Sequence, residues 1–240
     1  MIHLDRLSQV QPETISLTAV IDTALCVGAG GSSGSLADKP IVRNAQKQLI
    51  IPASQLKGRL RHECEKLARG LGWQIFESPA AETLSPLEAN ENWSHLRQDY
   101  TVEGYRGYHC LVSQIFGDPI LPSRVIVDDL ICKVPEEELP EVLRPGVTIN
   151  RKRRTAEERK LYLLETSPAN AQLEFEGEIH LLKPNCPEYA KPLILAALHH
   201  IHALGGSKSA GLGWLTWKDL PQMSATDAAW LGLKAKKTNL

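Results

Sequence analysis

The run Ile15-Ser-Leu-Thr-Ala-Val-Ile-Asp22 sets the start of the fold, because an apolar side chain occupies every second position. This spacing is typical of a strand with one buried face. The side chains that share the buried face are Ile15, Leu17, Ala19 and Ile21. The stretch that follows, Gly28–Ser35, consists of glycine, serine and one alanine, so it predicts a flexible loop.

A helix is predicted next, over residues 54–69. Ser54 is expected to cap its N-terminus, and Gly70 and Gly72 are expected to end it. Gly58 lies in the middle and costs about 0.8–1.0 kcal/mol relative to alanine, which predicts that another group packs against the backbone there. The predicted buried stripe consists of Leu56, Leu60, Cys64, Leu67 and Leu71.

The remaining periodic segments complete an alternating pattern of strands and helices. They are a strand over 124–133, a strand over 171–182, a helix over 187–204 and a short strand over 214–217. The order is β-α-β-β-α-β, which predicts an α+β protein with a ferredoxin-like (RRM-like) core. Two interruptions, near 77–120 and 134–170, fall at connections, where insertions are tolerated.

Composition limits the class of protein. The 240 residues are 42% hydrophobic and 23% charged, and no run of eighteen apolar residues is present, so we expect a soluble chain without a membrane span. The first residues lack the features of a secretory signal. Five scattered cysteines favour reduced thiols over a disulfide framework. We therefore expect a cytoplasmic location.

The net charge of −1 argues against a chain that coats nucleic acid indiscriminately, but the charges are segregated along the sequence. Acidic residues cluster at Glu136–Glu138 and between 77 and 103. Basic residues cluster between 57 and 66 and between 144 and 160. This segregation predicts a polarised surface.

The stretch Gly205–Gly213 follows a predicted helix and precedes a predicted strand. A P-loop requires the reverse order, so nucleotide hydrolysis is disfavoured. Glycine lets backbone N–H groups approach a phosphate closely, and a lysine stands in the loop. The residues predicted to contact RNA here are Gly206, Ser207, Lys208 and Ser209; the alternative is an ordinary turn.

The start of the 54–69 helix is a second candidate for anion binding. A helix N-terminus offers free N–H groups, and several cations stand in its first turns. The residues predicted to contact RNA are Ser54, Lys57, Arg59 and Arg61. The alternative is a solvated helix face.

Taken together, these segments resemble the RAMP proteins of CRISPR systems, in order over roughly residues 15–218. The closest likeness is to the backbone subunits of type III effector complexes, which line up along a guide RNA and cut the paired target RNA. The runs that carry the resemblance are Asp38-Lys-Pro-Ile-Val-Arg43, Ile51–Arg61, Ile115-Phe-Gly-Asp118, Ser123–Asp128, Ile149–Thr155, Leu163-Leu-Glu165 and Gly205–Gly213.

The resemblance implies a single RAMP domain over residues 1–240. Its core is expected at about 12–72, 120–133 and 171–220, with a lid-like insertion at about 73–119, a thumb-like β-hairpin insertion at about 134–170 and a tail at 221–240. In the family the thumb lies beside the duplex of guide and target. The residues that the resemblance places there are Arg151, Lys152, Arg153, Arg154 and Thr155.

The resemblance also implies a catalytic residue. In the family a loop aspartate followed by Xaa-Pro is required for target cleavage, and Asp38-Lys39-Pro40 matches it. RNA supplies its own 2′-OH nucleophile, so a carboxylate with a divalent cation, Mg²⁺ or Mn²⁺, is sufficient and no organic cofactor is expected. The activity expected is that of a metal-dependent endoribonuclease within the assembled complex. The alternative for Asp38 is a turn cap.

Three functions stay open at this stage. The first is the guide-binding, target-cleaving backbone subunit, and the second is a non-catalytic RNA-binding scaffold subunit of the same complex. The third is a guide-processing endoribonuclease, which is weakest because such enzymes typically duplicate the fold and this chain shows one set of elements. The expected partners are guide RNA, target RNA, other effector subunits and copies or paralogues of the chain in a filament, with no membrane.

Several histidines and cysteines have side chains that can bind a metal ion. Some relatives carry zinc in the lid, and the candidate ligands are His62, Cys64, His109 and Cys110. No Cys-x-x-Cys pair occurs, and positions i and i+2 of a helix point apart, so core or surface roles are favoured. His199, His200 and His202 are interpreted as residues that favour the end of a helix electrostatically or face solvent.

Overall fold

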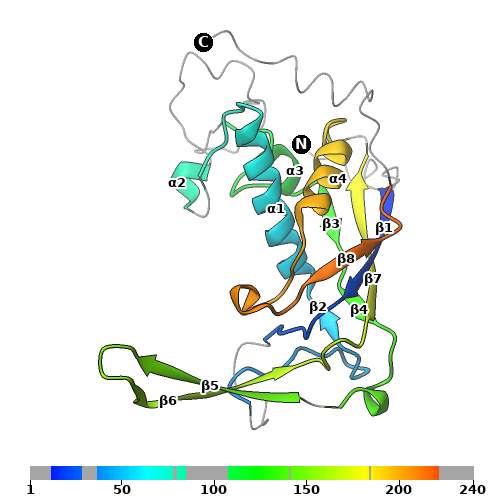
Figure 1. Ribbon diagram of the computed structural model, residues 1–240. Coiled ribbons are helices and arrows are strands. Elements are labelled where there is room, and N and C mark those ends of the chain that lie inside the picture. The colour runs from blue at the N-terminus through cyan, green and yellow to red at the C-terminus, as the bar shows by residue number, and fades with distance from the viewer. Residues whose placement is uncertain are drawn as a thin grey trace.

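The computed structural model describes residues 12–28, 37–77, 80–84, 108–140, 142–183 and 185–221. Its main sheet is antiparallel and follows the order β2-β4-β7-β1-β8, with β3 also paired to β7. The strands are β1 (Pro12–Ile21), β2 (Ile50–Ile51), β3 (Val125–Val127), β4 (Leu130–Cys132), β7 (Leu173–Leu182) and β8 (Leu215–Lys218). Helices α1 (Ala53–Gly70) and α4 (Ala190–His200) contact each other on the same side of this sheet (Figure 1).

This arrangement is α+β and is compatible with the expected ferredoxin-like fold. The first strand, β1, lies between β7 and β8, and both pairs are antiparallel. A helix precedes β3 and β4, and another joins β7 to β8. The predicted order of strands and helices is therefore present, with β3 and β4 together in the place of the second core strand.

The predicted inward faces form the core. The four alternating side chains of β1 are each exposed by 2% or less. They face the buried residues of β7, among them Phe175 and Ile179, in the register Ile15↔Ile179 and Ala19↔Phe175. Leu56, Leu60 and Cys64 of the helix stripe are fully buried, whereas Leu67 and Leu71 are only partly buried at the edge of the core.

Several predicted boundaries are wrong, and one side chain explains two of the errors. The strand expected over 124–133 is interrupted between Val127 and Leu130. Within the break, Asp129 turns its carboxylate to α1, where Oδ1 accepts a hydrogen bond of 2.6 Å from the Ala53 N–H. Ser54 accordingly makes no capping hydrogen bond, and the N-cap position is Pro52. The pair of residues in β2 is too short to show a period and was not predicted.

Two expectations about helices also change. Apart from the neighbouring backbone of α1, no described atom lies within 4 Å of the position that a Cβ at Gly58 would occupy, so no described part of this chain packs against the backbone there. Helix α4 is shorter than the predicted 187–204 segment, because the chain after His200 becomes extended. Ala203 there forms a bridge with Trp214, and the Leu204 N–H donates to the Gly213 carbonyl at 2.9 Å. His199 and His200 are exposed in the last turn of α4.

A separate two-stranded sheet, β5 (Val142–Asn150) with β6 (Thr155–Thr166), projects from the body as a long hairpin (Figure 1). It falls within the interruption expected near 134–170. The short helices are α2 (Ala81–Leu84), α3 (Ser113–Phe116), η3 (Glu136–Glu138) and η4 (Lys208–Ala210). Much of the expected lid-like segment, and nearly all of the expected tail, lie outside the described residues. None of the described helices has the length and apolar character needed to span a membrane.

Candidate nucleic-acid interface

Three segments that are far apart in the sequence meet just after β1. The Leu25 N–H donates to Ser167 Oγ and the Ser167 N–H donates to the Leu25 carbonyl, each at 2.9 Å, which joins the end of β6 to this point. The Gly206 N–H donates to the Cys26 carbonyl at 2.6 Å, which joins the glycine-rich loop. We call this meeting point of residues 24–28, 163–167 and 205–213 the junction.

Glycine is required at two positions of the loop. Gly205 has φ +91°, and a Cβ there would lie 2.6 Å from the Cys26 carbonyl oxygen. Gly213 has φ +71°, and its Cβ would lie 1.8 Å from the Leu204 carbonyl oxygen. Both positions favour glycine for conformational and steric reasons. The loop is therefore held against the segment that follows β1, where the Gly213 N–H also donates to the Ala24 carbonyl at 2.9 Å.

The predicted RNA-contacting residues of this loop are exposed. Ser207 adopts a left-handed conformation and precedes the single turn η4. Lys208 Nζ donates to the Gly205 carbonyl at 2.8 Å, so its ammonium also closes the loop on itself. Beneath the loop, Leu212 packs with Cys26 and Leu164 in a small apolar cluster. Burial raises the pKa of the Cys26 thiol, against the opposing effect of Lys39.

Asp38 lies at the junction beside the base of the hairpin. Its Oδ2 accepts a hydrogen bond of 2.7 Å from the Leu163 N–H, and its own N–H donates to the Leu163 carbonyl at 3.0 Å. Lys39 forms a parallel bridge with Leu164. The side chain of Asp38 is exposed, so its position is fixed by β6 while its carboxylate stays open to solvent.

A buried glutamate at the end of β6, to which the sequence alone assigns no role, holds the Asp38 segment in place. Glu165 is exposed by only 5%, and its Oε2 accepts a hydrogen bond of 3.0 Å from the Ile41 N–H. Arg43 Nη2 lies 3.9 Å from the other carboxylate oxygen. The runs 38–43 and 163–165 thus contact each other, which is a physical reason for both to occur together. The signal in the sequence was a charged residue at the end of an otherwise apolar triplet.

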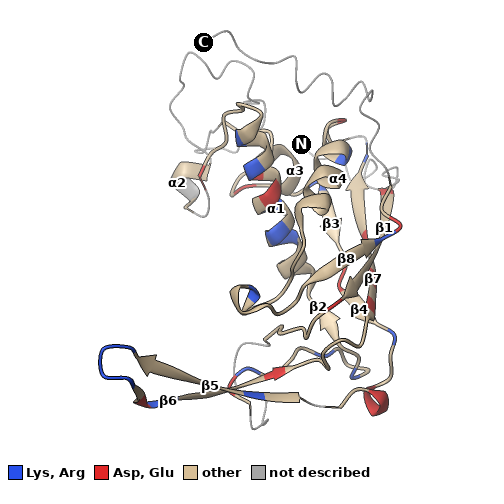
Figure 2. Cartoon of the chain, in the orientation of Figure 1, with Lys and Arg blue, Asp and Glu red and all other residues tan. Residues whose placement is uncertain are grey.

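The free end of the hairpin is strongly basic. Figure 2 shows Lys and Arg gathered in the loop that joins β5 to β6. Asn150 Oδ1 accepts hydrogen bonds from the N–H groups of Lys152 and Arg153, both at 3.1 Å, so the turn is closed by backbone donors. The register jumps from Val147↔Leu161 to Ile149↔Ala156, so residues 157–160 of β6 form a bulge in the pairing with β5. Residues 150–161 carry six basic and two acidic side chains.

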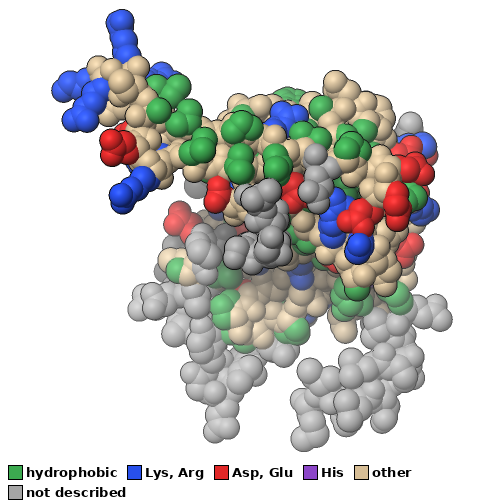
Figure 3. Space-filling model, turned by 90° about the horizontal axis from the view of Figure 1, so that it is seen from below, with side chains coloured by type: hydrophobic (Ala, Val, Ile, Leu, Met, Phe, Trp, Pro, Cys, Tyr) green, Lys and Arg blue, Asp and Glu red, His purple; other side chains and the backbone are tan. Residues whose placement is uncertain are grey.

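The shaft of the hairpin exposes apolar side chains. Leu143, Val147, Ile149, Leu161 and Tyr162 are each exposed by 40% or more, up to 68% for Leu161. Figure 3 shows hydrophobic side chains along the projecting arm, next to its basic end. A two-stranded hairpin is at best marginally stable alone, so this apolar surface suits contact with another molecule.

The basic side chains of helix α1 that were predicted to contact RNA have hydrogen-bond or ion-pair partners within the chain. Lys57 Nζ donates to Ser123 Oγ at 2.8 Å, and burial together with the nearby Arg61 guanidinium lowers its pKa. Arg61 Nη1 donates to the Gly117 carbonyl at 2.9 Å, and Arg59 pairs with Glu63 at 3.0 Å. The helix N-terminus itself is capped by Asp129, as described above. At the predicted anion site, Lys57 and Arg61 thus bind the 113–125 segment of the same chain, and Arg59 binds Glu63 of its own helix.

The candidate zinc ligands do not come together among the described residues. His62 is exposed, whereas Cys64 is buried and its pKa is raised by burial. His109 Nδ1 lies 2.5 Å from Asp118 Oδ2 in a fully buried pair. Burial alone would raise the pKa of Asp118, but His109 and the N–H groups of Leu121 and Ile120 outweigh it and the pKa is lowered. The pair stabilises the turn after α3.

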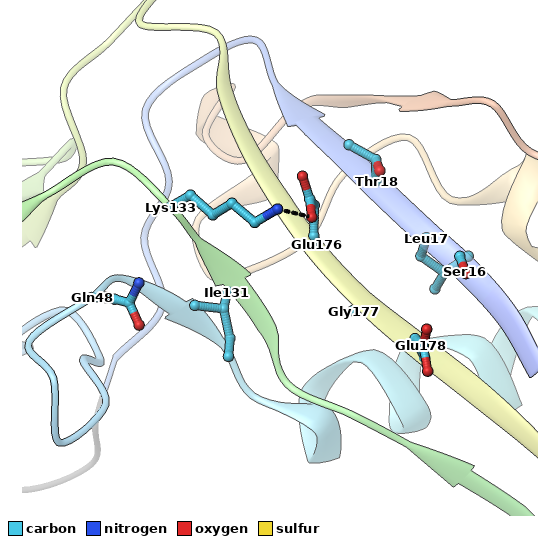
Figure 4. Close-up of a pocket in the computed structure, with 9 residues that line it drawn as sticks. All are labelled: Ser16, Leu17, Thr18, Gln48, Ile131, Lys133, Glu176, Gly177 and Glu178. Atoms are coloured by element: carbon cyan, nitrogen blue, oxygen red, sulfur yellow. Dashed lines mark ion pairs between the residues drawn. The ribbon is translucent and has the colours of Figure 1, made fainter.

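The outer face of the main sheet is acidic. Glu174, Glu176 and Glu178 point outward from β7, beside Ser16 and Thr18 of β1. An open hollow of about 500 Å³ lies on this face, and Figure 4 shows Lys133 paired with Glu176 among the residues that line it. Lys218 likewise pairs with Glu174, so two of the three carboxylates on this face are balanced by lysine.

The chain is an α+β protein in which a glycine-rich loop and the base of a projecting, basic-tipped hairpin meet at the end of the first strand of an antiparallel sheet. Residues 18–216 match the model of the RAMP superfamily, and the chain belongs to this superfamily. The match begins inside β1 and ends inside β8, so it includes both helices, the junction and the hairpin. Membership indicates a CRISPR-associated, RNA-binding subunit of an effector complex. Comparison with curated proteins finds no match.

Proposed function

We propose that the chain is a backbone subunit of a type III CRISPR effector complex, in which it binds guide RNA and cleaves the paired target RNA with Asp38 and a divalent cation. The observation that carries the proposal is the position of Asp38. Its carboxylate is exposed and fixed by Leu163 at the base of a hairpin whose free end is the most basic segment of the chain. A lone carboxylate needs its substrate held by other elements, and we propose the glycine-rich loop at the junction and the basic end of the hairpin for this role.

The expected division of work follows from the geometry. The cations of residues 151–154 and the glycine-rich loop contact phosphates and position the RNA without reading its sequence. Asp38 contributes by holding a divalent cation, Mg²⁺ or Mn²⁺, or by assisting deprotonation of the 2′-OH. Attack of that oxygen on the adjacent phosphorus breaks the bond to the 5′ oxygen of the next nucleotide. One product then ends in a 2′,3′-cyclic phosphate, and the other begins with a 5′-OH.

The hairpin is proposed as the thumb that lies beside the guide–target duplex. Its exposed apolar shaft supports contact with a further subunit, either a copy of this chain or a paralogue, because such a surface is unstable in water. On this proposal the basic end contacts RNA while the shaft contacts protein.

A non-catalytic scaffold subunit is the second candidate. The observation that favours it is that Asp38 Oδ2 already accepts the Leu163 N–H, which is a structural use of an aspartate in a turn. A residue kept for this contact alone would have no role in cleavage.

Two substitutions at one position separate the candidates. Asp38→Asn keeps an oxygen that accepts the Leu163 N–H but removes the charge, whereas Asp38→Ala removes both. In the assembled complex, with Mg²⁺ or Mn²⁺, both variants should lose target cleavage while guide and target affinities stay within about twofold. Asp22→Asn, which removes the charge of a carboxylate directly after β1 that accepts hydrogen bonds from Gln172 and Thr216 and none from β6, is the matched control and should cut normally.

The substrate provides a second test of the same mechanism. A 2′-deoxy nucleotide at the scissile position should block cleavage by the parent complex, because the nucleophile is absent. Cleavage by Asp38→Asn at the parent's rate would refute the catalytic role of the carboxylate. A parent complex that never cuts in either metal would establish the scaffold instead.

A further inference from the structure

Three side chains with metal-ligand chemistry meet on the outer face of the main sheet. His180 Nε2 lies 3.0 Å from Asp128 Oδ2 and 3.8 Å from Glu178 Oε2. The three ligand atoms all lie within 4.8 Å of one another. No other group of three such side chains occurs among the residues that the structure describes.

The backbone that carries this group is held by strand pairing. Glu178 and His180 are two residues apart on β7, so both point to the outer face. Asp128 directly follows β3, which pairs with β7, and its N–H donates to the Glu178 carbonyl at 2.9 Å. The ligand atoms therefore need only small side-chain rotations to converge, and these rotations are available because both carboxylates are about half exposed.

The other nitrogen of the histidine has a partner of its own. His180 Nδ1 lies 3.1 Å from Thr14 Oγ1, on the residue directly opposite in β1. A metal-bound histidine usually donates its second N–H to an oxygen, which fixes the ring and its tautomer. With the proton on Nδ1, the lone pair of Nε2 points between the two carboxylates.

We propose that Asp128, Glu178 and His180 bind one divalent transition-metal ion of the zinc type. Ligand atoms about 2.0–2.1 Å from a tetrahedral ion are about 3.3–3.4 Å apart, and the distances of 3.0 and 3.8 Å fall on either side of this value. Imidazole favours zinc and its neighbours in the first row over Mg²⁺ or Ca²⁺. Three protein ligands leave one position for water or a side chain from a partner.

The surroundings favour a cation at this point. Lys133 pairs with Glu176 and Lys218 pairs with Glu174, whereas the described ion pair of Glu178 is with His180 alone. Figure 4 shows Glu178 apart from the Lys133–Glu176 pair and next to the open hollow, which gives an ion access to it. The plain alternative is a histidine shared between two carboxylates with no metal.

This site is separate from the proposed cleavage site and does not rest on it. Asp38 contacts β6 at the junction, whereas the three ligands stand on β7 and directly after β3, on the outer face of the main sheet. A bound ion would link the two strands where β3 ends, and its open position faces outward, where another subunit could supply a fourth ligand.

The test uses the full chain, stripped of metal with a chelator and titrated with Zn²⁺ by calorimetry and with Co²⁺ by visible absorption. We expect one equivalent to bind, with Co²⁺ bands typical of low coordination number, and Mg²⁺ in large excess should not compete. His180→Ala and Glu178→Gln should abolish this binding. Thr14→Val, which removes only the second partner of the histidine, should weaken it by about 10–100-fold.

Glu176→Gln is the matched control, because it removes the same charge from the same face two residues away. It should leave the affinity unchanged. Thermal unfolding of each variant without metal keeps loss of fold apart from loss of a ligand. The proposal is overturned if neither ion binds saturably, if Glu176→Gln is as harmful as Glu178→Gln, or if His180→Ala binds like the parent.

Discussion

Replacing Arg151 and Arg153 with serine should reduce the salt dependence of RNA binding. Both side chains are exposed at the end of the hairpin, and the turn beneath them is closed by backbone N–H groups that donate to Asn150. The double substitution therefore removes two cations without removing the contacts that shape the turn. Any loss of affinity can then be assigned to phosphate contacts rather than to unfolding of the loop.

The size of the effect follows from the release of counterions. Each phosphate contact on a double helix contributes about 0.9 to the slope of log K against log salt, so two contacts contribute about 1.8. Relative to 1 M salt, where these contacts contribute nothing, a slope of about 1.8 means that the variant loses about 60-fold in affinity at 0.1 M salt. Between 50 and 200 mM salt, the parent should weaken about 12-fold more than the variant.

The assay is fluorescence anisotropy with a labelled guide strand and with the same guide paired to its target, over a series of salt concentrations. The matched control is Lys66→Ser with Arg69→Ser, which removes two exposed cations at the far end of α1. The control should keep the parent's slope. An unchanged slope for the hairpin variant, or an equal change for the control, would refute the assignment of the hairpin end to phosphate binding. Equal losses for guide and duplex would count against its role as a thumb.

Two further predictions concern the fold. Gly58→Ala should raise the free energy of unfolding by about 0.8–1.0 kcal/mol in urea denaturation, because the site is open and helical. Gly213→Ala should lower it by at least about 1–3 kcal/mol, because φ is positive there and a Cβ would contact Leu204. A destabilised Gly58→Ala would show that another group does pack against the helix at that point. The pKa of Asp118 is lowered in the fold, so its contribution to stability is complete above its ordinary value of 3.8 and is lost as the pH falls through the lower folded value. Asp118→Asn should flatten that part of an acid titration followed by circular dichroism, and an unchanged acid limb would contradict this reasoning.

Much of the fold could be predicted because periodicity is a local property. The alternation in β1 and the three-to-four spacing in α1 identify buried faces without any knowledge of their partners. The basic turn at 151–154 and the glycine-rich loop at 205–213 are likewise visible as composition. A strand of two residues, such as β2, is too short to show a period and therefore cannot be predicted in this way. The interruption of the 124–133 strand likewise has no signal in the local sequence.

The tertiary structure decided which polar groups meet, since this depends on register between distant strands and on the direction of single side chains. Asp38 and Leu163 are 125 residues apart, and only pairing at the base of the hairpin brings the carboxylate to that N–H. The sequence showed the cations of α1 but not that Lys57 would bind Ser123 within the protein. Nothing in the local sequence around His180 indicates that it meets Thr14 of β1 and Asp128 after β3. Local pattern thus determined the elements and their buried faces, whereas the pairing of those elements in space decided where charge, hydrogen-bond donors and candidate ligands converge.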